Sequence, residues 1–157
     1  MAADLPDIAA MIRALAEFEN LRHLCVMTES GLEDALFGPR PAAEVLICRI
    51  DGAPAGFALY FQSFSTFLAR RGIWLEDLFV YPEYRGTGVG TSLLKAVASI
   101  AMARHCGRFE WAVLDWNTQA IRFYQSLGAN LMPDWRIARV TGTALENLAR
   151  CDGVHGM

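Results

Sequence analysis

The sequence predicts a mixed α/β domain in which a central mixed, largely antiparallel sheet is flanked by helices. The order of the elements carries this prediction. Two amphipathic segments open the chain, two short apolar runs that flank Asp51 and Gly52 follow them, and strand-like and helix-like segments then alternate. Neither a helical bundle nor a sandwich has this order.

Several segments have the apolar periodicity and the end signals of helices. Asp4 is the predicted N-cap of the first, Thr28 caps the second, and Gly128 ends the fourth. The predicted helices cover about 5–19, 28–37, 88–105, 117–127 and 143–150.

Short runs rich in apolar residues are predicted strands. Asp51 to Pro54 form a turn that joins the first two into a hairpin, and residues 65–72 form a loop that carries Arg70 and Arg71. The predicted strands cover 45–50, 56–64, 73–80, 109–114 and 135–140. Because no repeat, linker or low-complexity tract interrupts this order, residues 1–150 are predicted to form one domain and residues 151–157 a flexible tail.

The composition disfavours several classes of partner. The 157 residues carry a formal net charge of −3, so the chain lacks the basic surplus that nucleic-acid binding requires. No apolar run approaches the roughly 18 residues of a membrane-spanning helix, and Asp4 and Asp7 stand where a basic leader would lie. We therefore expect neither nucleic-acid nor membrane binding. The hydrophobic fraction of 54% suggests a well-filled core and a subunit interface.

The cysteines and histidines predict no metal site. The four cysteines are scattered without a CxxC pair, which argues against a disulfide framework and favours a cytoplasmic location. Neither His23 with Cys25 nor His105 with Cys106 has the spacing of zinc ligands.

The stretch LEDLFVYPEYRGTGVG, residues 75–90, is the most informative motif. A strand-like run ends at Tyr81 and Pro82, alternating glycines follow Arg85, and an amphipathic run begins directly after them. A strand, a glycine turn and a helix start form an anion site in this order, because backbone N–H groups and the helix dipole point at one place. A tight turn without a ligand is the less favoured alternative.

The glycine spacing disfavours two common phosphate ligands. A nucleoside-triphosphate loop needs Lys followed by Ser or Thr after its last glycine, and here Thr91 and Ser92 follow Gly90. A dinucleotide fingerprint has GxGxxG in the first strand–helix–strand unit and an acidic residue about 20 positions later at the end of a strand. This turn is GxGxG in mid-chain, and Glu110 lies near the start of the next strand.

The pattern Arg-Gly-x-Gly-x-Gly between a strand and a helix resembles the acetyl-CoA loop of the GNAT acetyltransferase superfamily. More narrowly, the chain resembles the diamine (spermidine/spermine) acetyltransferase branch, which includes relatives that act on lysine-like amines. The motifs that carry this resemblance are LEDLFVYPEYRGTGVG, AEFE near the N-terminus, WN at 116–117, FYQSLGA at 123–129 and DWR at 134–136. The resemblance covers about residues 4–150.

One departure from the family concerns the start of the chain. Family members open with a strand before the first helix, and here the first helix begins almost at Met1. The first strand of the family is therefore expected to be missing, through truncation, a misassigned start or true absence. If it is absent, the neighbouring strand becomes an unprotected sheet edge.

Acetyl transfer from a thioester to an amine needs a neutral amine, a stabilised oxyanion and a proton for the departing thiolate. A phenol with a pKa near 10 can share a proton with a thiol of pKa near 8.5. The resemblance places Tyr124 at the general-acid position of the family, and the alternative is an aromatic side chain packed beside Phe123. The resemblance also implies that Glu76 takes part in deprotonating the amine through water.

Glu76 and Asp77 interrupt an apolar strand, and strict alternation predicts that they face opposite sides of the sheet. A carboxylate on a covered face is unfavourable unless it is paired or functional. Asp77 and Glu19 are candidates for an acidic lining that selects cations, and Trp135 for a wall of the amine site with a cation–π face. A solvated Glu19 and an ordinary packing role for Trp135 are the alternatives.

For the cofactor, the resemblance implies acetyl-CoA along the strand end and the glycine turn. The backbone of Leu78 and Val80 is expected to pair with the pantetheine arm. Asn117 is expected to bond the pantetheine, to cap the following helix, or to do both. The residues expected to hold the diphosphate are Arg85, Gly86, Thr87, Gly88, Val89, Gly90 and Thr91.

These expectations predict an acetyl-CoA-dependent N-acetyltransferase that acts as a homodimer on a small cationic amine, namely a polyamine, a diamine or a lysine analogue. No cysteine occupies a matched catalytic position, so direct attack in a ternary complex is expected. One alternative keeps the fold with a protein, peptide or aminoglycoside acceptor. Another is a non-catalytic acyl-CoA-binding sensor. The acidic and aromatic candidates favour a small closed pocket over an open peptide groove.

Overall fold

The computed structural model describes residues 1–150, which fall into two compact units, Met1–Ala112 and the segment that begins at Val113. The predicted tail, residues 151–157, lies outside the described residues. None of the helices in residues 1–150 has both the length and the apolar character that crossing a bilayer requires.

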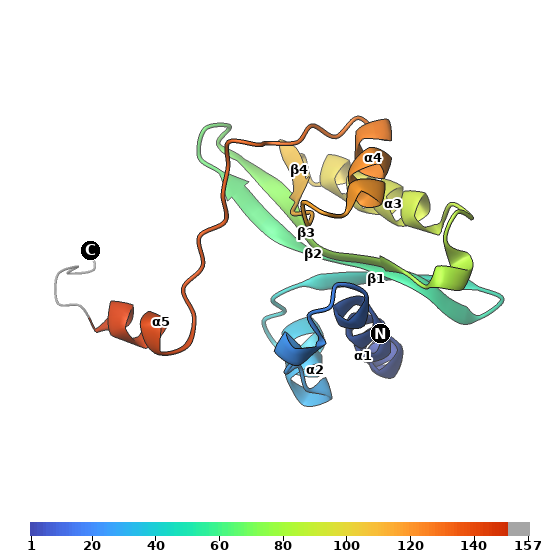
Figure 1. The fold of residues 1–157 in the computed structure, drawn as a ribbon, viewed down its shortest axis with the longest axis horizontal. Helices are drawn as coiled ribbons and strands as arrows, with labels where there is room; N and C mark the ends of the chain where they lie inside the picture. The colour runs from blue at the N-terminus through green and yellow to red at the C-terminus, as the bar shows by residue number, and fades with distance from the viewer. Residues whose placement is uncertain (151–157) are drawn as a thin grey trace. The chain divides into compact units, whose positions relative to one another are not determined.

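The first unit combines helices with a sheet (Figure 1). Its helices are α1 (Leu5–Phe18), α2 (Glu29–Phe37) and α3 (Val89–Ala103), with short 3₁₀ turns η1 (Ala2–Asp4), η2 (Arg22–Leu24) and η3 (Pro82–Tyr84). Its strands are β1 (Glu44–Ile50), β2 (Ala53–Ser65), β3 (Arg70–Val80) and β4 (Arg108–Trp111). Each α-helix and strand confirms a predicted element, although β2 and β3 are longer and β4 is shorter than predicted.

The sheet has four strands in the order β1-β2-β3-β4. β1 pairs with β2, and β2 with β3, in antiparallel fashion, whereas β3 and β4 are parallel. This topology confirms the prediction of a mixed, largely antiparallel sheet. Within the described residues no strand precedes α1, and β1 forms one edge of the sheet.

Half of the predicted loop 65–72 belongs to strands, so that prediction is wrong in its extent. The ladder between β2 and β3 continues to the pair Ser65 and Arg70, and residues 66–69 make the turn. Gly72 lies inside β3, where an added Cβ would come within 2.6 Å of the Ser63 Oγ atom. The glycine that signals a loop in the sequence instead allows close approach within the sheet.

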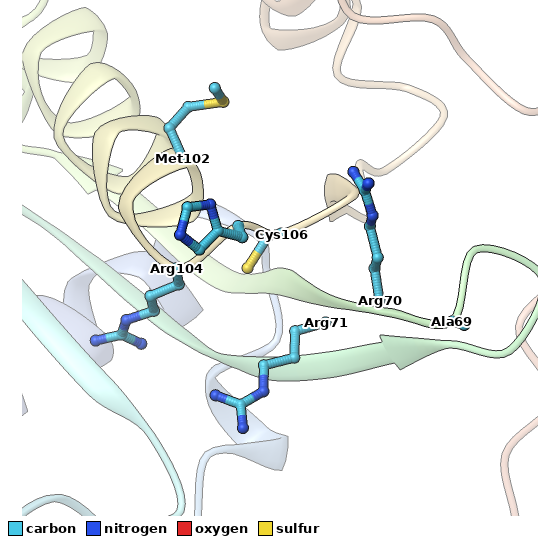
Figure 2. A pocket seen from close by; sticks show the side chains of 7 residues that line it. Ala69, Arg70, Arg71, Met102, Arg104 and Cys106 are labelled. Atoms are coloured by element: carbon cyan, nitrogen blue, oxygen red, sulfur yellow. The ribbon is translucent and has the colours of Figure 1, made fainter.

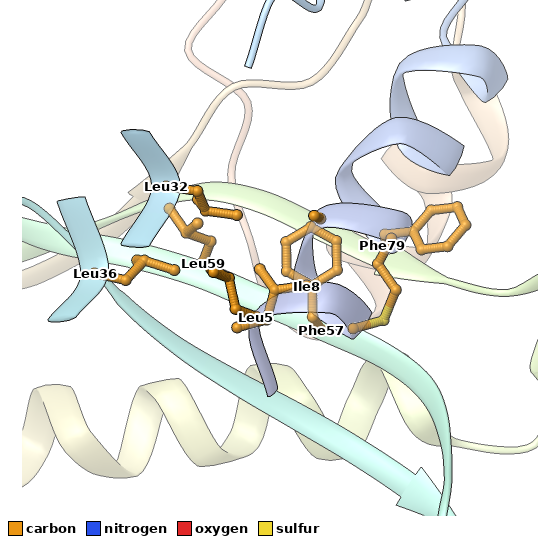
Figure 3. Packing of buried hydrophobic residues seen from close by; sticks show 9 residues of the cluster. Leu5, Ile8, Leu32, Leu36, Phe57, Leu59 and Phe79 are labelled. Atoms are coloured by element: carbon orange, nitrogen blue, oxygen red, sulfur yellow. The ribbon is translucent and has the colours of Figure 1, made fainter. Parts of the chain in front are cut away.

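Helices α1 and α2 pack on one face of the sheet through an apolar cluster (Figure 3). Ile8 and Met11 of α1 and Phe57 of β2 are completely buried. Full burial of one such side chain stabilises the fold by about 1.5–3 kcal/mol. The cluster therefore holds α1 against β2 and β3 and fixes the position of Glu19, the C-cap residue of α1.

Helix α3 covers the opposite face of the sheet (Figure 1). Its buried residues recur at helical spacing and are Val89, Leu93, Leu94, Val97 and Ala101. Because α3 begins directly after the glycine turn, this packing holds its N-terminus beside the end of β3.

The second unit contains α4 (Thr118–Ser126) and α5 (Gly142–Ala149). Both confirm predicted helices. The predicted strand 135–140 is wrong, because residues 127–141 contain neither helix nor strand. Trp135, Ile137 and Val140 give the segment apolar residues, but a strand needs a partner, and the described residues supply none.

Candidate active site

The glycine turn joins the end of β3 to the start of α3. Gly86 and Gly88 have φ values of +76° and +92°, and an added Cβ at either would meet nothing within 4 Å. These two glycines are therefore required by backbone conformation and not by crowding. Gly90 lies inside the first turn of α3.

The N-terminus of α3 has no side-chain cap. Gly88 is its N-cap residue, and no side chain accepts a hydrogen bond from the first turn. The first N–H groups of a helix have no partner within the helix, and they carry the positive end of its dipole. The turn thus leaves backbone donors of the kind that can bind an anion.

Two side chains tie the turn to its surroundings. Arg85 donates through Nε to the carbonyl oxygen of Val80 at 3.0 Å, and Thr87 donates through Oγ1 to the carbonyl oxygen of Tyr84 at 2.6 Å. The Arg85 guanidinium also lies over the ring of Phe18, the last residue of α1. Sequence reasoning missed Phe18, because only the folded chain brings α1 beneath this turn.

A β-bulge changes the prediction that Glu76 and Asp77 face opposite sides of the sheet. Asp77 pairs with Leu59 and Leu75 pairs with Tyr60, so Glu76 is an extra residue in β3. Asp77 lies on the face of Leu59, which belongs to the cluster under α1 and α2.

Glu76 lies on this same face, because its Oε2 accepts a hydrogen bond from Trp74 Nε1 at 3.0 Å. Trp74 pairs with Phe61, which shares the face of Leu59 by alternation. The prediction of opposite faces is therefore wrong, because it assumes an unbroken ladder. The bulge directs both carboxylates to the α1 side, with Glu76 exposed and Asp77 half-buried.

A pocket of about 190 Å³ lies between the end of α1, the segment around η2 and β3. Asp77 and Glu19 are its acidic residues, and the rest of its lining is mostly apolar, with Leu21, Leu24 and Cys25 contributed by the segment after α1. The structure thus brings together the two predicted acidic candidates. Sequence reasoning missed the three residues of the segment after α1, which carry no motif.

The two carboxyls of this pocket are both easier to protonate than usual. Burial, and to a smaller extent the negative charges of Glu76 and Glu19, raise the pKa of Asp77 to about 6. Burial also raises the pKa of Glu19. A pocket that disfavours its own negative charges gains most from a bound cation, which offsets the desolvation of both carboxylates.

The second unit holds the remaining candidates. Asn117 caps α4, because its Oδ1 accepts a hydrogen bond from the backbone N–H of Ala120 at 3.1 Å. Tyr124 lies seven residues later, on the same face of α4, and its ring centre is 5.4 Å from that of Phe123. Both Asn117 and Tyr124 are half-buried. Trp135 lies outside α4, and its exposed fraction is 77%.

Within residues 1–150 there is no group of three or more His, Cys, Asp or Glu side chains that could hold a metal ion. The site is built instead from a mixed sheet, a glycine turn at a helix start and an acidic pocket on the same strand. These features fit the α/β acetyltransferase class that the sequence resembles.

Comparisons with known proteins identify the family. The chain matches the acetyltransferase (GNAT) family over residues 10–129. It is 39% identical over 158 residues to the thialysine N-epsilon-acetyltransferase of Mus musculus, with 94% of this chain and 92% of that protein covered. It is 36% identical over 188 residues to the L-ornithine N5-acetyltransferase of Arabidopsis thaliana, with 91% and 82% covered.

A solved structure also resembles this chain. An integron cassette protein from the mobile metagenome of V. cholerae superposes with a TM-score of 0.77 at 28% identity, over 92% of this chain and 90% of that one. The chain therefore belongs to the GNAT acetyltransferase family, and it is an N-acetyltransferase.

Proposed function

We propose that the protein transfers acetyl from acetyl-CoA to a primary amine of a small cationic substrate, namely a polyamine, a diamine or a lysine analogue. One observation carries this proposal: the acidic pocket around Asp77 and the anion-binding turn after Val80 lie along the same strand. The names of the relatives, which specify thialysine and ornithine, support an amine of this class.

The exposed side of β3 supports the proposed path of the cofactor. β4 pairs with β3 only from Gly72 to Leu75, so within residues 1–150 no strand pairs with residues 76–80 on that side. The N–H of Tyr81 donates to the carbonyl oxygen of Ala55 in β2. Because successive residues of a strand direct their backbone N–H and C=O groups to opposite sides, those of Leu78 and Val80 point away from β2. In this proposal the backbone groups of Leu78 and Val80 pair with the amide-bearing pantetheine arm, with the Val80 carbonyl also accepting from Arg85, and the turn from Arg85 to Thr91 receives the diphosphate.

Size and charge support the proposed acceptor. The pocket of about 190 Å³ is small and mostly apolar, with two carboxylates. An ammonium group can bind between Asp77 and Glu19 while its alkyl chain contacts Leu21 and Leu24. A peptide or an aminoglycoside is larger than this volume accommodates, so both are less favoured acceptors.

In the proposed reaction the amine nitrogen attacks the thioester carbonyl directly within a ternary complex. Glu76, which Trp74 holds by a hydrogen bond, attracts and orients the amine and relays its proton to water. Tyr124 donates a proton to the departing sulfur, and Trp135 contributes an aromatic wall. Asn117 caps α4 with its side-chain oxygen, and its side-chain NH₂ group donates to the pantetheine.

The decisive experiment measures thiol release from acetyl-CoA with a panel of amines: thialysine, ornithine, lysine, putrescine, spermidine, a peptide with a free N-terminus and an aminoglycoside. Release with one or more of the first five supports the proposal. Selective release with the peptide or the aminoglycoside supports the alternative acceptors. Binding of acetyl-CoA without release for any amine supports a sensor.

The order of the reaction is tested by initial rates. Intersecting double-reciprocal lines are expected for a ternary complex, and parallel lines would indicate an acyl-enzyme. Cys25 lies in the amine pocket and is the thiol to examine in that case. Mass spectrometry of the enzyme with acetyl-CoA alone is expected to show no added acetyl group.

We further propose that residues 1–150 act as one acetyltransferase domain and that the protein is a cytoplasmic homodimer. The high apolar content supports a subunit interface. The thiols of Cys25, Cys48 and Cys106 are unpaired by disulfides, which is consistent with a reducing compartment. Light scattering coupled to size-exclusion chromatography tests the dimer, for which twice the monomer mass is expected.

A further inference from the structure

A second pocket lies in the first unit, at the opposite end of α3 from the glycine turn (Figure 2). Its volume is about 520 Å³, and the end of α3, the residues after it and the start of β3 line it. α3 has 15 residues, so at about 1.5 Å per residue its two ends are roughly 22 Å apart. This pocket is therefore separate from the turn proposed to bind acetyl-CoA. We propose that it binds a small phosphate-bearing anion.

The charge of the lining supports an anion. Arg70, Arg71 and Arg104 all line this pocket, together with His105. Within residues 1–150 no carboxylate pairs with the guanidinium of Arg70 or Arg71, and both residues are exposed. A solvated arginine on a smooth surface would be unremarkable, but three that border one cavity of this size form a cationic concavity.

The carboxylate that faces this region is already engaged. Glu44 of β1 binds Arg104 through both oxygens, at 2.5 and 2.7 Å. Arg108, which neighbours the pocket in sequence, pairs with Glu110 at 2.7 Å. The charges of Arg70 and Arg71 are therefore left uncompensated, one at each rim of the pocket.

The walls of the pocket are tied together by backbone contacts. The N–H of Gly107 donates to the carbonyl oxygen of Arg71 at 2.8 Å, which joins the segment after α3 to β3. A Cβ at Gly107 would lie 2.9 Å from Leu68 Cδ1 and 3.3 Å from Arg70 Cβ, so the missing side chain lets the Arg70 stem pack closely. A cavity held in this way is largely formed before a ligand arrives, which lowers the entropic cost of binding.

The arrangement of donors favours phosphate. In Figure 2 the side chains of Arg71 and Arg104 extend to the same side of the ribbon, and Arg70 points away from them at the other rim. Guanidinium groups bind phosphate oxygens through paired N–H donors, and a ligand with more than one phosphate can contact both rims.

The C-terminal end of α3 carries a negative dipole that opposes an anion. Three of its carbonyl groups, however, already accept hydrogen bonds from Arg104, His105 and Cys106. A volume of about 520 Å³ lies within the range of pockets that bind small molecules.

Equilibrium dialysis with radiolabelled inorganic diphosphate tests the proposal. The full chain is first saturated with coenzyme A, so that the glycine turn is occupied. Diphosphate is expected to bind under these conditions at one site per chain. Binding that coenzyme A abolishes would place the diphosphate at the glycine turn and overturn the proposal, as would the absence of binding.

The double variant Arg70→Gln with Arg71→Gln is expected to bind diphosphate at least about tenfold more weakly, because two charge-assisted contacts are lost. The matched control is Arg40→Gln, which removes an exposed arginine from the loop between α2 and β1 and should leave binding within about twofold. Equal binding by the double variant and the wild type would overturn the proposal.

A second measurement does not depend on the variants. Arginine modification by hydroxyphenylglyoxal, read by mass spectrometry, should slow at Arg70 and Arg71 when diphosphate is present and remain unchanged at Arg40. Unchanged modification at all three residues would contradict the proposal. Neither experiment depends on which amine is acetylated, so their outcome is independent of the proposed activity.

Discussion

The guanidinium carbon of Arg85 lies 4.6 Å from the centre of the Phe18 ring. Arg85 belongs to the glycine turn, whereas Phe18 ends α1 and immediately precedes Glu19 of the acidic pocket. The turn and the pocket therefore share one short segment of chain. Changes at the end of α1 are expected to affect both substrates, and the two effects can be separated kinetically.

Phe18→Leu tests the contact with Arg85. Leucine keeps an apolar side chain but removes the aromatic face, and a partly exposed cation–π contact contributes about 0.5–1 kcal/mol. The KM for acetyl-CoA should rise by roughly two- to fivefold, with little change in kcat. Arg85→Lys, which keeps the charge but loses the Nε donation to Val80, should have an effect in the same direction. An unchanged KM in both variants would contradict this role.

Asp77→Asn should stabilise the free protein at high pH. The pKa of Asp77 is raised from 3.8 to about 6, so the folded chain binds more protons than the unfolded chain between these values. The free energy of unfolding of the wild type should therefore fall as pH rises from about 4 to about 6 and then level off. This pKa shift of about two units corresponds to a loss of at most roughly 3 kcal/mol in the free energy of unfolding.

Denaturant titrations at pH 4 and pH 8 measure this effect. The free energy of unfolding of Asp77→Asn should exceed that of the wild type by about 1–3 kcal/mol at pH 8 and match it at pH 4. The same variant should bind the amine more weakly, because the pocket loses a carboxylate. Glu33→Gln, an exposed change on α2, is the control and should alter neither property. A variant less stable than the wild type at pH 8 would contradict the assignment.

Tyr124→Phe tests the proposed general acid. General acid catalysis contributes about 10²–10⁴-fold to a rate, so kcat should fall by at least about tenfold while acetyl-CoA affinity stays nearly intact. Tyr60→Phe removes a phenol that contacts Glu44 in the first unit, and it should leave kcat unchanged. Unchanged turnover in Tyr124→Phe would exclude the acid role.

Gly88→Ala and Gly52→Ala form a matched pair. Both glycines have positive φ, +92° and +82°, and neither would place a Cβ within 4 Å of another atom. Each substitution should lower the free energy of unfolding by roughly 1 kcal/mol through backbone strain. Only Gly88→Ala should also raise the KM for acetyl-CoA, because its methyl group projects from the turn that is proposed to receive the diphosphate. Equal KM values for the two variants would argue against this site.

Asn117→Asp separates the two roles of this residue. Aspartate retains the oxygen that accepts from Ala120, and it is as good an N-cap as asparagine. The variant should therefore keep its thermal stability but lose the amide donors and bind acetyl-CoA more weakly. Asn117→Ala should lose stability as well, by about 1 kcal/mol. Full acetyl-CoA affinity in Asn117→Asp would leave only the capping role.

Local sequence signals predicted those parts of the fold that depend on local interactions. The apolar spacing of α1, the Thr28 cap of α2 and the glycines before α3 are properties of short segments, and all three elements are present. The strand predicted at 135–140 depends on a partner, and alternation within one segment carries no information about a partner.

The acidic residues of the site show the same limit. The sequence indicates that Glu76 and Asp77 are unusual, because they interrupt an apolar run. Their common orientation depends on the register between β3 and β2, which only the folded sheet defines. Likewise, the contact between Phe18 and Arg85 joins residues far apart in the chain, and no local pattern in either segment predicts it.

The extra residue at Glu76 also matters for how related chains are aligned and redesigned. Deleting Glu76 would restore a regular ladder between β2 and β3. Every side chain of β3 on one side of the deletion would then face the opposite side of the sheet. Either Phe79 would leave the cluster under α1, or Ile73 and Leu75 would lose their buried positions. A one-residue gap at this position is therefore not a neutral length difference. Transplanting this proposed acceptor pocket into another chain requires the inserted residue as well as the two acids.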